Sequence, residues 1–65
     1  MIQVTRLNNT KFVINADLIE IIEALPDTTI TLTTGKKFVV KESIEEIMRK
    51  IINYRKAIYG VLEEY

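Results

Sequence analysis

Alternating residues at positions 26–41 constrain this chain most strongly, because they read as a β-hairpin with one buried face. Ile30 and Leu32 alternate with threonines before Gly35, and apolar residues alternate with lysines after it. Strict alternation is typical of strands that bury one face and expose the other. We therefore expect the apolar side chains to point to the core. The threonines expected on the exposed face are Thr29, Thr31 and Thr33.

The turn of this hairpin is predicted from its glycine. A two-residue turn at Thr34 and Gly35 would force the β-branched Thr34 to positive φ, which is costly. We therefore expect a type I turn through Thr33 and Thr34, followed by a left-handed Gly35 at a β-bulge. At the entrance of the hairpin, Pro26 and Asp27 favour another turn, since proline presets φ and aspartate can bond its own backbone.

A first hairpin is expected over residues 2–15. Ile2 and Val4 alternate with polar residues in the first strand, and Phe12 alternates with Val13 in the return strand. The intervening pair at positions 8–9 is Asn-Asn, and asparagine tolerates the left-handed region better than most residues. These features predict a tight turn between two short strands.

Residues 15–25 allow two interpretations. As a helix, the segment would be capped by Asn15 and followed by Pro26. Its apolar stripe would be Leu18, Ile19, Ile21, Ile22 and Leu25. As a strand, its isoleucines suit a β-sheet, and ten residues is short for an isolated helix. We favour a short helical turn at residues 16–18 and a strand over about 19–24, which leaves four or five strands.

The C-terminal helix begins at a capping box. In the sequence Ser-Ile-Glu-Glu at positions 43–46, the serine and the second glutamate can bond each other's backbone N–H groups. Gly60 predicts the end of the helix at about Tyr59, with a tail over residues 60–65. The expected fold is therefore α+β: one domain over residues 1–65, with a small antiparallel β-meander followed by one amphipathic helix.

This helix carries more apolar surface than a few short strands are expected to cover. Ile44, Ile47 and Ile51 begin a stripe, and Met48 and Ile52 widen it. One interpretation is an ordinary core with a folded-back C-terminus. The other is an interface with a second copy or another protein, since contiguous apolar patches mark interfaces. The residues expected in that interface are Tyr54, Ile58, Tyr59, Val61 and Leu62, with Val13 and Val39 adding apolar strand surface.

Composition narrows the classes of function. The 65 residues include no Cys and no His, which excludes disulfides and the usual zinc sites. Formal net charge is zero, which disfavours a general polyanion binder and removes long-range repulsion between copies. No apolar run reaches the length of a membrane span and no signal-peptide core is present, so we expect a cytoplasmic protein, with peripheral membrane association as an alternative.

Charged side chains offer few candidates for chemistry. The acidic residues Asp17, Glu20, Glu23 and Asp27 cluster in sequence, and we interpret them as solvated surface charge rather than an acid–base pair. The basic residues of the strands are Arg6, Lys11, Lys36, Lys37 and Lys41. Lysine on exposed strands prevents edge-to-edge aggregation, although phosphate binding is the alternative. No catalytic, cofactor or metal residues are predicted.

Several segments of the sequence resemble the FlbD/SwrD family of small flagellar proteins. They are Met-Ile-Gln-Val-Thr-Arg-Leu-Asn at 1–8, Phe-Val-Ile-Asn-Ala-Asp-Leu-Ile-Glu at 12–20, Pro-Asp-Thr-Thr-Ile-Thr-Leu-Thr-Thr-Gly-Lys-Lys at 26–37 and Val-Val-Lys-Glu-Ser at 39–43. The resemblance extends to about residue 56. It implies a bacterial motility protein linked to swarming and to the power of the flagellar motor, without enzymatic activity or cofactor.

Two functions from different classes follow. The first is a motility protein that binds a motor or export component, or assembles with itself, on the cytoplasmic side of the motor. The alternative is a small nucleic-acid-binding regulator that uses Lys36, Lys37 and Lys41, because small β-meanders with a helix serve that role. Salt-dependent binding of DNA would distinguish the two.

Overall fold

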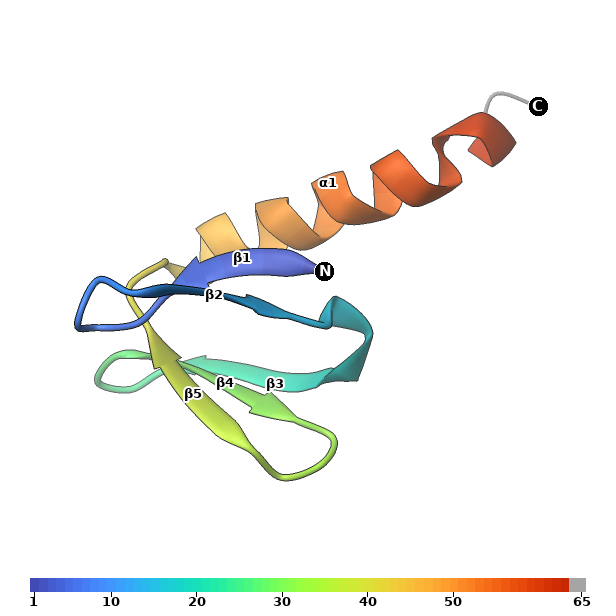
Figure 1. The fold of residues 1–65 in the computed structure, drawn as a ribbon. Coiled ribbons are helices and arrows are strands. Elements are labelled where there is room, and N and C mark those ends of the chain that lie inside the picture. The colour runs from blue at the N-terminus through green and yellow to red at the C-terminus, as the bar shows by residue number, and fades with distance from the viewer. Residues whose placement is uncertain (64–65) are drawn as a thin grey trace.

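The computed structural model describes residues 1–63, with side chains described for residues 1–58. Five strands precede one helix, where the sequence predicted four or five strands and a helix (Figure 1). The elements are β1 (Ile2–Thr5), β2 (Lys11–Ile14), a 3₁₀ turn η1 (Ala16–Leu18), β3 (Ile19–Ala24), β4 (Thr28–Leu32), β5 (Lys37–Val40) and α1 (Ile44–Glu63). All strand pairs are antiparallel, with β1 and β2 in one sheet and β3, β4 and β5 in another. The α+β fold with a meander and a helix is therefore confirmed.

The first hairpin closes on an asparagine in the left-handed conformation. Asn9 has a φ of 71° and donates its N–H to the Arg6 carbonyl at 2.9 Å. The Arg6 N–H in turn donates to the Thr10 carbonyl at 2.8 Å. The predicted tight turn at positions 8–9 is confirmed, and it aligns Val4 with Phe12 on the same face of the sheet.

The ambiguous segment adopts the favoured interpretation. The Asn15 side chain accepts the Asp17 N–H at 3.0 Å and caps η1, and β3 follows directly. The pairing of β3 with β4 shifts register between Ile19 and Ile21, which is a β-bulge at Glu20. An Asn cap and β-branched residues thus divide the segment into a turn and a strand rather than a longer helix.

The second hairpin has the predicted turn. Gly35 lies at a φ of +90° and donates its N–H to the Leu32 carbonyl at 2.9 Å. The Leu32 N–H donates to the Lys36 carbonyl at 2.8 Å, so that one extra residue stands on the β5 side. This is a type I turn followed by a glycine bulge, as expected from the cost of placing a threonine at positive φ.

The predicted exposure of the threonines is wrong for Thr31. Its side chain is 8% exposed, because β4 is the central strand and Thr31 lies between Ile21 of β3 and Lys37 of β5. Those longer side chains cover it from both sides. Thr29 is half-buried, and only Thr33, in the turn, is exposed. A period-two pattern predicts which face a residue is on, but not how far its neighbours cover it.

The two sheets meet where β1 and β5 end. Arg6 forms an isolated antiparallel bridge with Val40, and the Lys41 N–H donates to the Thr5 carbonyl at 2.8 Å. The inner faces of both sheets and the first half of α1 enclose one core. Its buried members are Ile2, Val4, Ile14, Ala16, Ile30, Leu32, Val40 and Ile47.

The helix begins as predicted but ends later. The Ser43 N–H donates to the Glu46 carboxylate, and the Glu46 N–H donates to the Ser43 hydroxyl, both at 3.1 Å. The capping box is therefore confirmed. The predicted end at Gly60 is wrong, because α1 continues to Glu63. Glycine in a helix costs only about 1 kcal/mol relative to alanine, and no proline follows to stop the helix.

Candidate interaction surfaces

The Glu42 carboxylate fastens the start of α1 to β1. It accepts the Thr5 N–H at 2.9 Å and the Thr5 hydroxyl at 2.8 Å. Partial burial raises the pKa of Glu42, but the two bonds from Thr5, together with its own N–H and the charge of Lys50, outweigh burial and hold this pKa below its usual value. The ionised Glu42 thus fixes where the helix leaves the sheets.

Burial decreases along one stripe of α1 as the helix passes the end of the sheets. Ile47 is fully buried, Ile51 and Tyr54 are half-buried against the core, and Ile58 is 51% exposed. These residues are spaced at three and four positions, so they share one face of the helix. Figure 1 shows the cause, since the later turns of α1 extend beyond the sheets. The same stripe is therefore core at one end and surface at the other.

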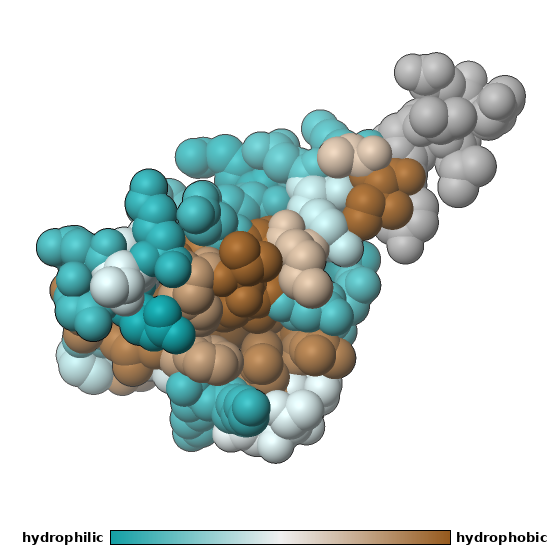
Figure 2. Space-filling model, in the orientation of Figure 1, coloured by the Kyte–Doolittle hydropathy of each residue, from teal (hydrophilic) through white to brown (hydrophobic). Residues whose placement is uncertain are grey.

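Further apolar side chains flank the stripe on the helix. Met48 and Ile52 are each 49% exposed, and every side chain from Arg55 to Ile58 is exposed. Figure 2 shows apolar surface over the middle of the body and again near the end of the described helix. We define the helix surface as Met48, Ile52 and Ile58. It contains Ile58 of the predicted interface, together with Met48 and Ile52, which were expected to widen the stripe.

The predicted interface residues have different positions in the structure. Ile58 is exposed as predicted, whereas Tyr54 packs against the core. Tyr59, Val61 and Leu62 lie outside the described side chains. Val13 and Val39 are exposed on the strands, at 59% and 41%, as expected for apolar residues on outer strand faces. The structure thus places Ile58 and the flanking Met48 and Ile52 on one accessible helix.

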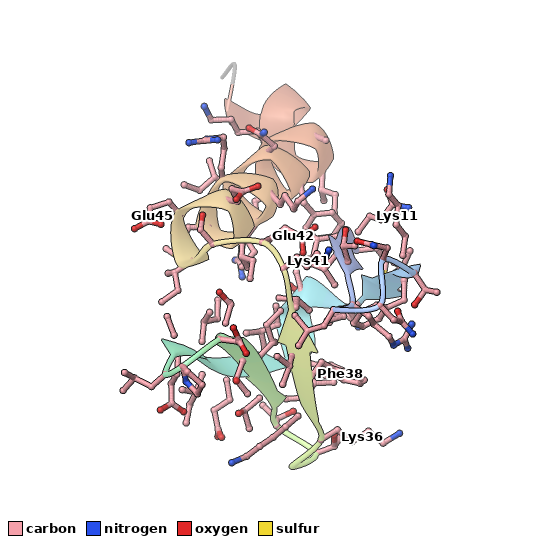
Figure 3. All side chains as sticks on the ribbon, turned by 90° about the vertical axis from the view of Figure 1, so that its left-hand side faces the viewer. Lys11, Lys36, Phe38, Lys41, Glu42 and Glu45 are labelled. Carbon is pink, nitrogen blue, oxygen red and sulfur yellow. The ribbon has the colours of Figure 1, made fainter. Side chains whose placement is uncertain are left out.

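The charged residues form no acid–base constellation among residues 1–58. The four clustered carboxylates are all exposed, and Asp17 lies 3.9 Å from Arg55. The lysines are also dispersed. Figure 3 shows Lys36 at the far tip of the β4–β5 turn and Lys41 at the other end of β5, beside Glu42. The Lys41 ammonium bonds the side-chain carbonyl of Asn9. The basic residues therefore do not gather into one patch.

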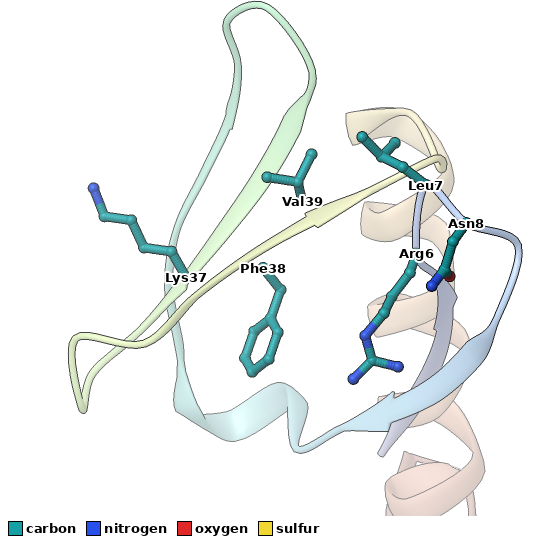
Figure 4. A pocket seen from close by; sticks show the side chains of 6 residues that line it. All are labelled: Arg6, Leu7, Asn8, Lys37, Phe38 and Val39. Carbon is teal, nitrogen blue, oxygen red and sulfur yellow. The ribbon is translucent and has the colours of Figure 1, made fainter.

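An open cavity of about 360 Å³ lies between β5 and the β1–β2 turn (Figure 4). We call it the β5 cleft. It is lined by Arg6, Leu7, Asn8, Lys37, Phe38 and Val39. Two of these side chains are cationic and three are apolar, and they come from the two different sheets. The cleft can therefore hold a ligand that is both anionic and apolar.

Aromatic side chains support the cleft from within. The Arg6 guanidinium lies 3.9 Å from the centre of the Phe12 ring, and the Phe12 and Phe38 rings are 5.3 Å apart at a 45° tilt. Stacking on an aromatic face holds a guanidinium in place without neutralising it. The sequence interpretation missed this stack. Its signal is an aromatic residue on the inward face of each hairpin, but their contact depends on how the sheets meet.

Comparison with protein families gives one assignment. The family model FlbD, described as flagellar and swarming motility proteins, matches residues 1–59. The chain belongs to this family. The match covers both sheets and α1 through Tyr59, so the helix surface and the β5 cleft both lie in the matched part. Comparison with curated proteins and with solved structures gave no match.

Membership of the FlbD family confirms the resemblance found in the sequence and associates this chain with flagellar and swarming motility. Within the described residues, no helix is long and apolar enough to cross a membrane. No group of three or more metal-binding side chains occurs there.

Proposed function

We propose that this protein supports the power of the flagellar motor as a non-enzymatic docking protein on the cytoplasmic side. In this proposal it binds a motor or export component and also associates with itself. Family membership supports the link to motility. The observation that carries the docking mechanism is the half-exposed apolar surface of Met48, Ile52 and Ile58 on a helix that extends past its own sheets.

The physical reason is the free energy of apolar surface in water. Burial of apolar area contributes about 25 cal/mol per Å². The helix leaves three large apolar side chains half-exposed, so covering them with a partner lowers the free energy. Exposed apolar surface rimmed by polar residues is a common feature of interaction sites. The helix offers it at an accessible position, because the sheets cover only its first turns.

Self-association is supported by the charge of the chain and by the shape of the surface. A formal net charge of zero gives no long-range repulsion between copies. A helix face that extends from the body can pack against the same face of a second copy, which is how most two-fold dimers are built. Such a pair would bury Ile58 between the two helices. A motor component with an apolar groove would cover the same residues.

A complementation experiment tests the proposal in cells. The gene is deleted, and the wild type, Ile58→Asp or Ala57→Asp is supplied in its place. Both variants add one carboxylate at an exposed position of α1, but only Ile58 belongs to the apolar stripe. We expect the wild type and Ala57→Asp to restore torque on tethered cells and Ile58→Asp to fail. Normal torque and swarming in the deletion strain would refute the motor function.

A further inference from the structure

The edge of β5 that faces the β5 cleft has no partner strand along most of its length. The Lys36 carbonyl points to β4, and the Lys41 N–H points to β1. Backbone groups alternate in direction along an antiparallel strand, so the Lys37 and Val39 N–H groups point away from β4, on the same side as that of Lys41. Among the described residues, β1 meets β5 only at the Arg6–Val40 bridge. The Lys37 and Val39 N–H groups therefore have no backbone acceptor among the described residues.

The cations of the β5 cleft are available to a ligand. Arg6 and Lys37 are both exposed, and within residues 1–58 neither is in an ion pair. No acidic side chain lines the cleft. Arg6 is held over Phe12, on the inner side, whereas Lys37 projects with Val39 from the outer face of the sheet (Figure 4). Positive charge thus stands on both sides of the open edge.

We propose that the β5 cleft binds an extended acidic segment of a partner protein, which adds as a strand along β5. Added strands gain affinity from backbone bonds and specificity from alternate side chains. Here the Lys37 and Val39 N–H groups receive the partner's carbonyls. Carboxylates on the partner's two faces meet Arg6 and Lys37, and its apolar residues contact Phe38 and Val39. This site is separate from the helix surface and does not depend on self-association.

The observations favour an acidic peptide over a nucleic acid. Affinity for a phosphate backbone grows with the number of neutralised phosphates, and the β5 cleft offers two cations. Lys41 is engaged by Asn9, and Lys36 lies at the hairpin tip, away from the helix end of β5 (Figure 3). An open strand edge, in contrast, matches a polypeptide backbone in spacing and in hydrogen-bonding groups. The site therefore combines main-chain recognition with a modest charge preference.

A binding assay with two peptides tests this site. The probes are fluorescein-labelled peptides in which pairs of Glu alternate with pairs of Val, or pairs of Lys with pairs of Val, so that each face of the extended strand carries both charged and apolar residues. Binding is measured by anisotropy with the full chain. We expect the Glu/Val peptide to bind and the Lys/Val peptide to bind at least about tenfold more weakly. Lys37→Glu should weaken the Glu/Val peptide by about tenfold or more. Lys56→Glu, the same change at an exposed helix position, should alter binding by less than about twofold.

A backbone measurement separates strand addition from simple charge attraction. In the free protein the Val39 amide should exchange with solvent quickly, and the Glu/Val peptide should slow it at least about tenfold. Unchanged Val39 exchange in a saturated complex would overturn strand addition. Equal binding of both peptides, no effect of Lys37→Glu or no binding at all would overturn the acidic-segment site. Tighter binding of an oligothymidine at the same residues would assign the cleft to nucleic acid instead.

Discussion

One pair of substitutions tests how α1 is divided between core and surface. Ile47 and Ile58 are the same residue type on the same stripe of the helix, but Ile47 is 0% exposed and Ile58 is 51% exposed. Replacing either by alanine removes the same three carbon atoms and keeps a good helix former. The two variants therefore differ only in what surrounds the side chain.

The expected magnitudes follow from burial. Each buried carbon contributes about 0.8 kcal/mol, so Ile47→Ala loses roughly 2.5 kcal/mol of transfer free energy. The cavity left behind brings the total destabilisation to about 3–5 kcal/mol. Domains of this length have about 3–10 kcal/mol of stability, so this variant should be close to unfolding. Ile58→Ala leaves no cavity in a single copy and should cost about 0.5 kcal/mol or less.

Urea unfolding followed by circular dichroism measures both free energies, and thermal unfolding gives the melting temperatures. We expect Ile47→Ala to lower the melting temperature by more than about 10 °C and Ile58→Ala by only a few degrees. Ile47→Val, which removes one carbon and should cost about 0.5–1.5 kcal/mol, provides a measurable value if Ile47→Ala does not fold. Equal destabilisation by Ile58→Ala at the lowest workable concentration would refute the reasoning, because it would mean that one copy buries both ends of the stripe.

Other substitutions test individual features of the fold. Glu42→Gln should lower the free energy of unfolding by about 1 kcal/mol at pH 7, measured by urea unfolding. The folded pKa of Glu42 is lowered from 4.5, so the stability that this carboxylate contributes is present above that value and is lost as pH falls through the folded pKa. The free energies of unfolding of wild type and variant should therefore converge in acid. A difference that stays constant with pH would contradict this. Ser43→Ala should cost about 1 kcal/mol through loss of the cap, and unchanged stability would contradict the capping role. Gly35→Ala should cost about 1–2 kcal/mol, because a φ of +90° strains any residue with a Cβ, even though this Cβ would meet no atom within 4 Å. A neutral effect in thermal melts would contradict that strain. In gel shifts at low salt, DNA should not bind through Lys36, and binding that Lys36→Glu abolishes would favour the nucleic-acid alternative.

Local features of the fold were predictable because a few adjacent residues determine them. Asn9 and Gly35 each occupy the left-handed position of a hairpin turn, and the box from Ser43 to Glu46 starts the helix. In each case the cost of the competing conformation is set by residues within four positions. The division of residues 16–24 into a 3₁₀ turn and a strand was decided similarly, by the Asn15 cap.

The wrong predictions concern features that depend on the assembled fold. Thr31 is buried by neighbours on two other strands, and α1 passes Gly60 because a single glycine is a weak stop signal. The bond between Glu42 and Thr5 joins residues 37 positions apart, so no local pattern indicates it. The position of Arg6 over Phe12, which shapes the β5 cleft, also depends on how the hairpins pack.

The candidate interaction surfaces were predictable to different degrees. The excess apolar area of α1 follows from counting apolar positions on the helix, and the structure places Ile58 at 51% exposure. The β5 cleft was not predictable, since its lining residues come from two hairpins whose relative position is set by the Arg6–Val40 bridge. Sequence periodicity gives the faces of elements, whereas a cleft between elements requires their arrangement.

The mass of the protein in solution tests the central claim most directly, namely that the end of α1 is a docking surface and not part of a closed single-copy core. Light scattering at tens of micromolar should give a mass above that of one 7.5 kDa chain, and Ile58→Asp should return it to a single chain while Ala57→Asp does not. A wild type that remains at 7.5 kDa under these conditions would contradict self-association through the helix surface.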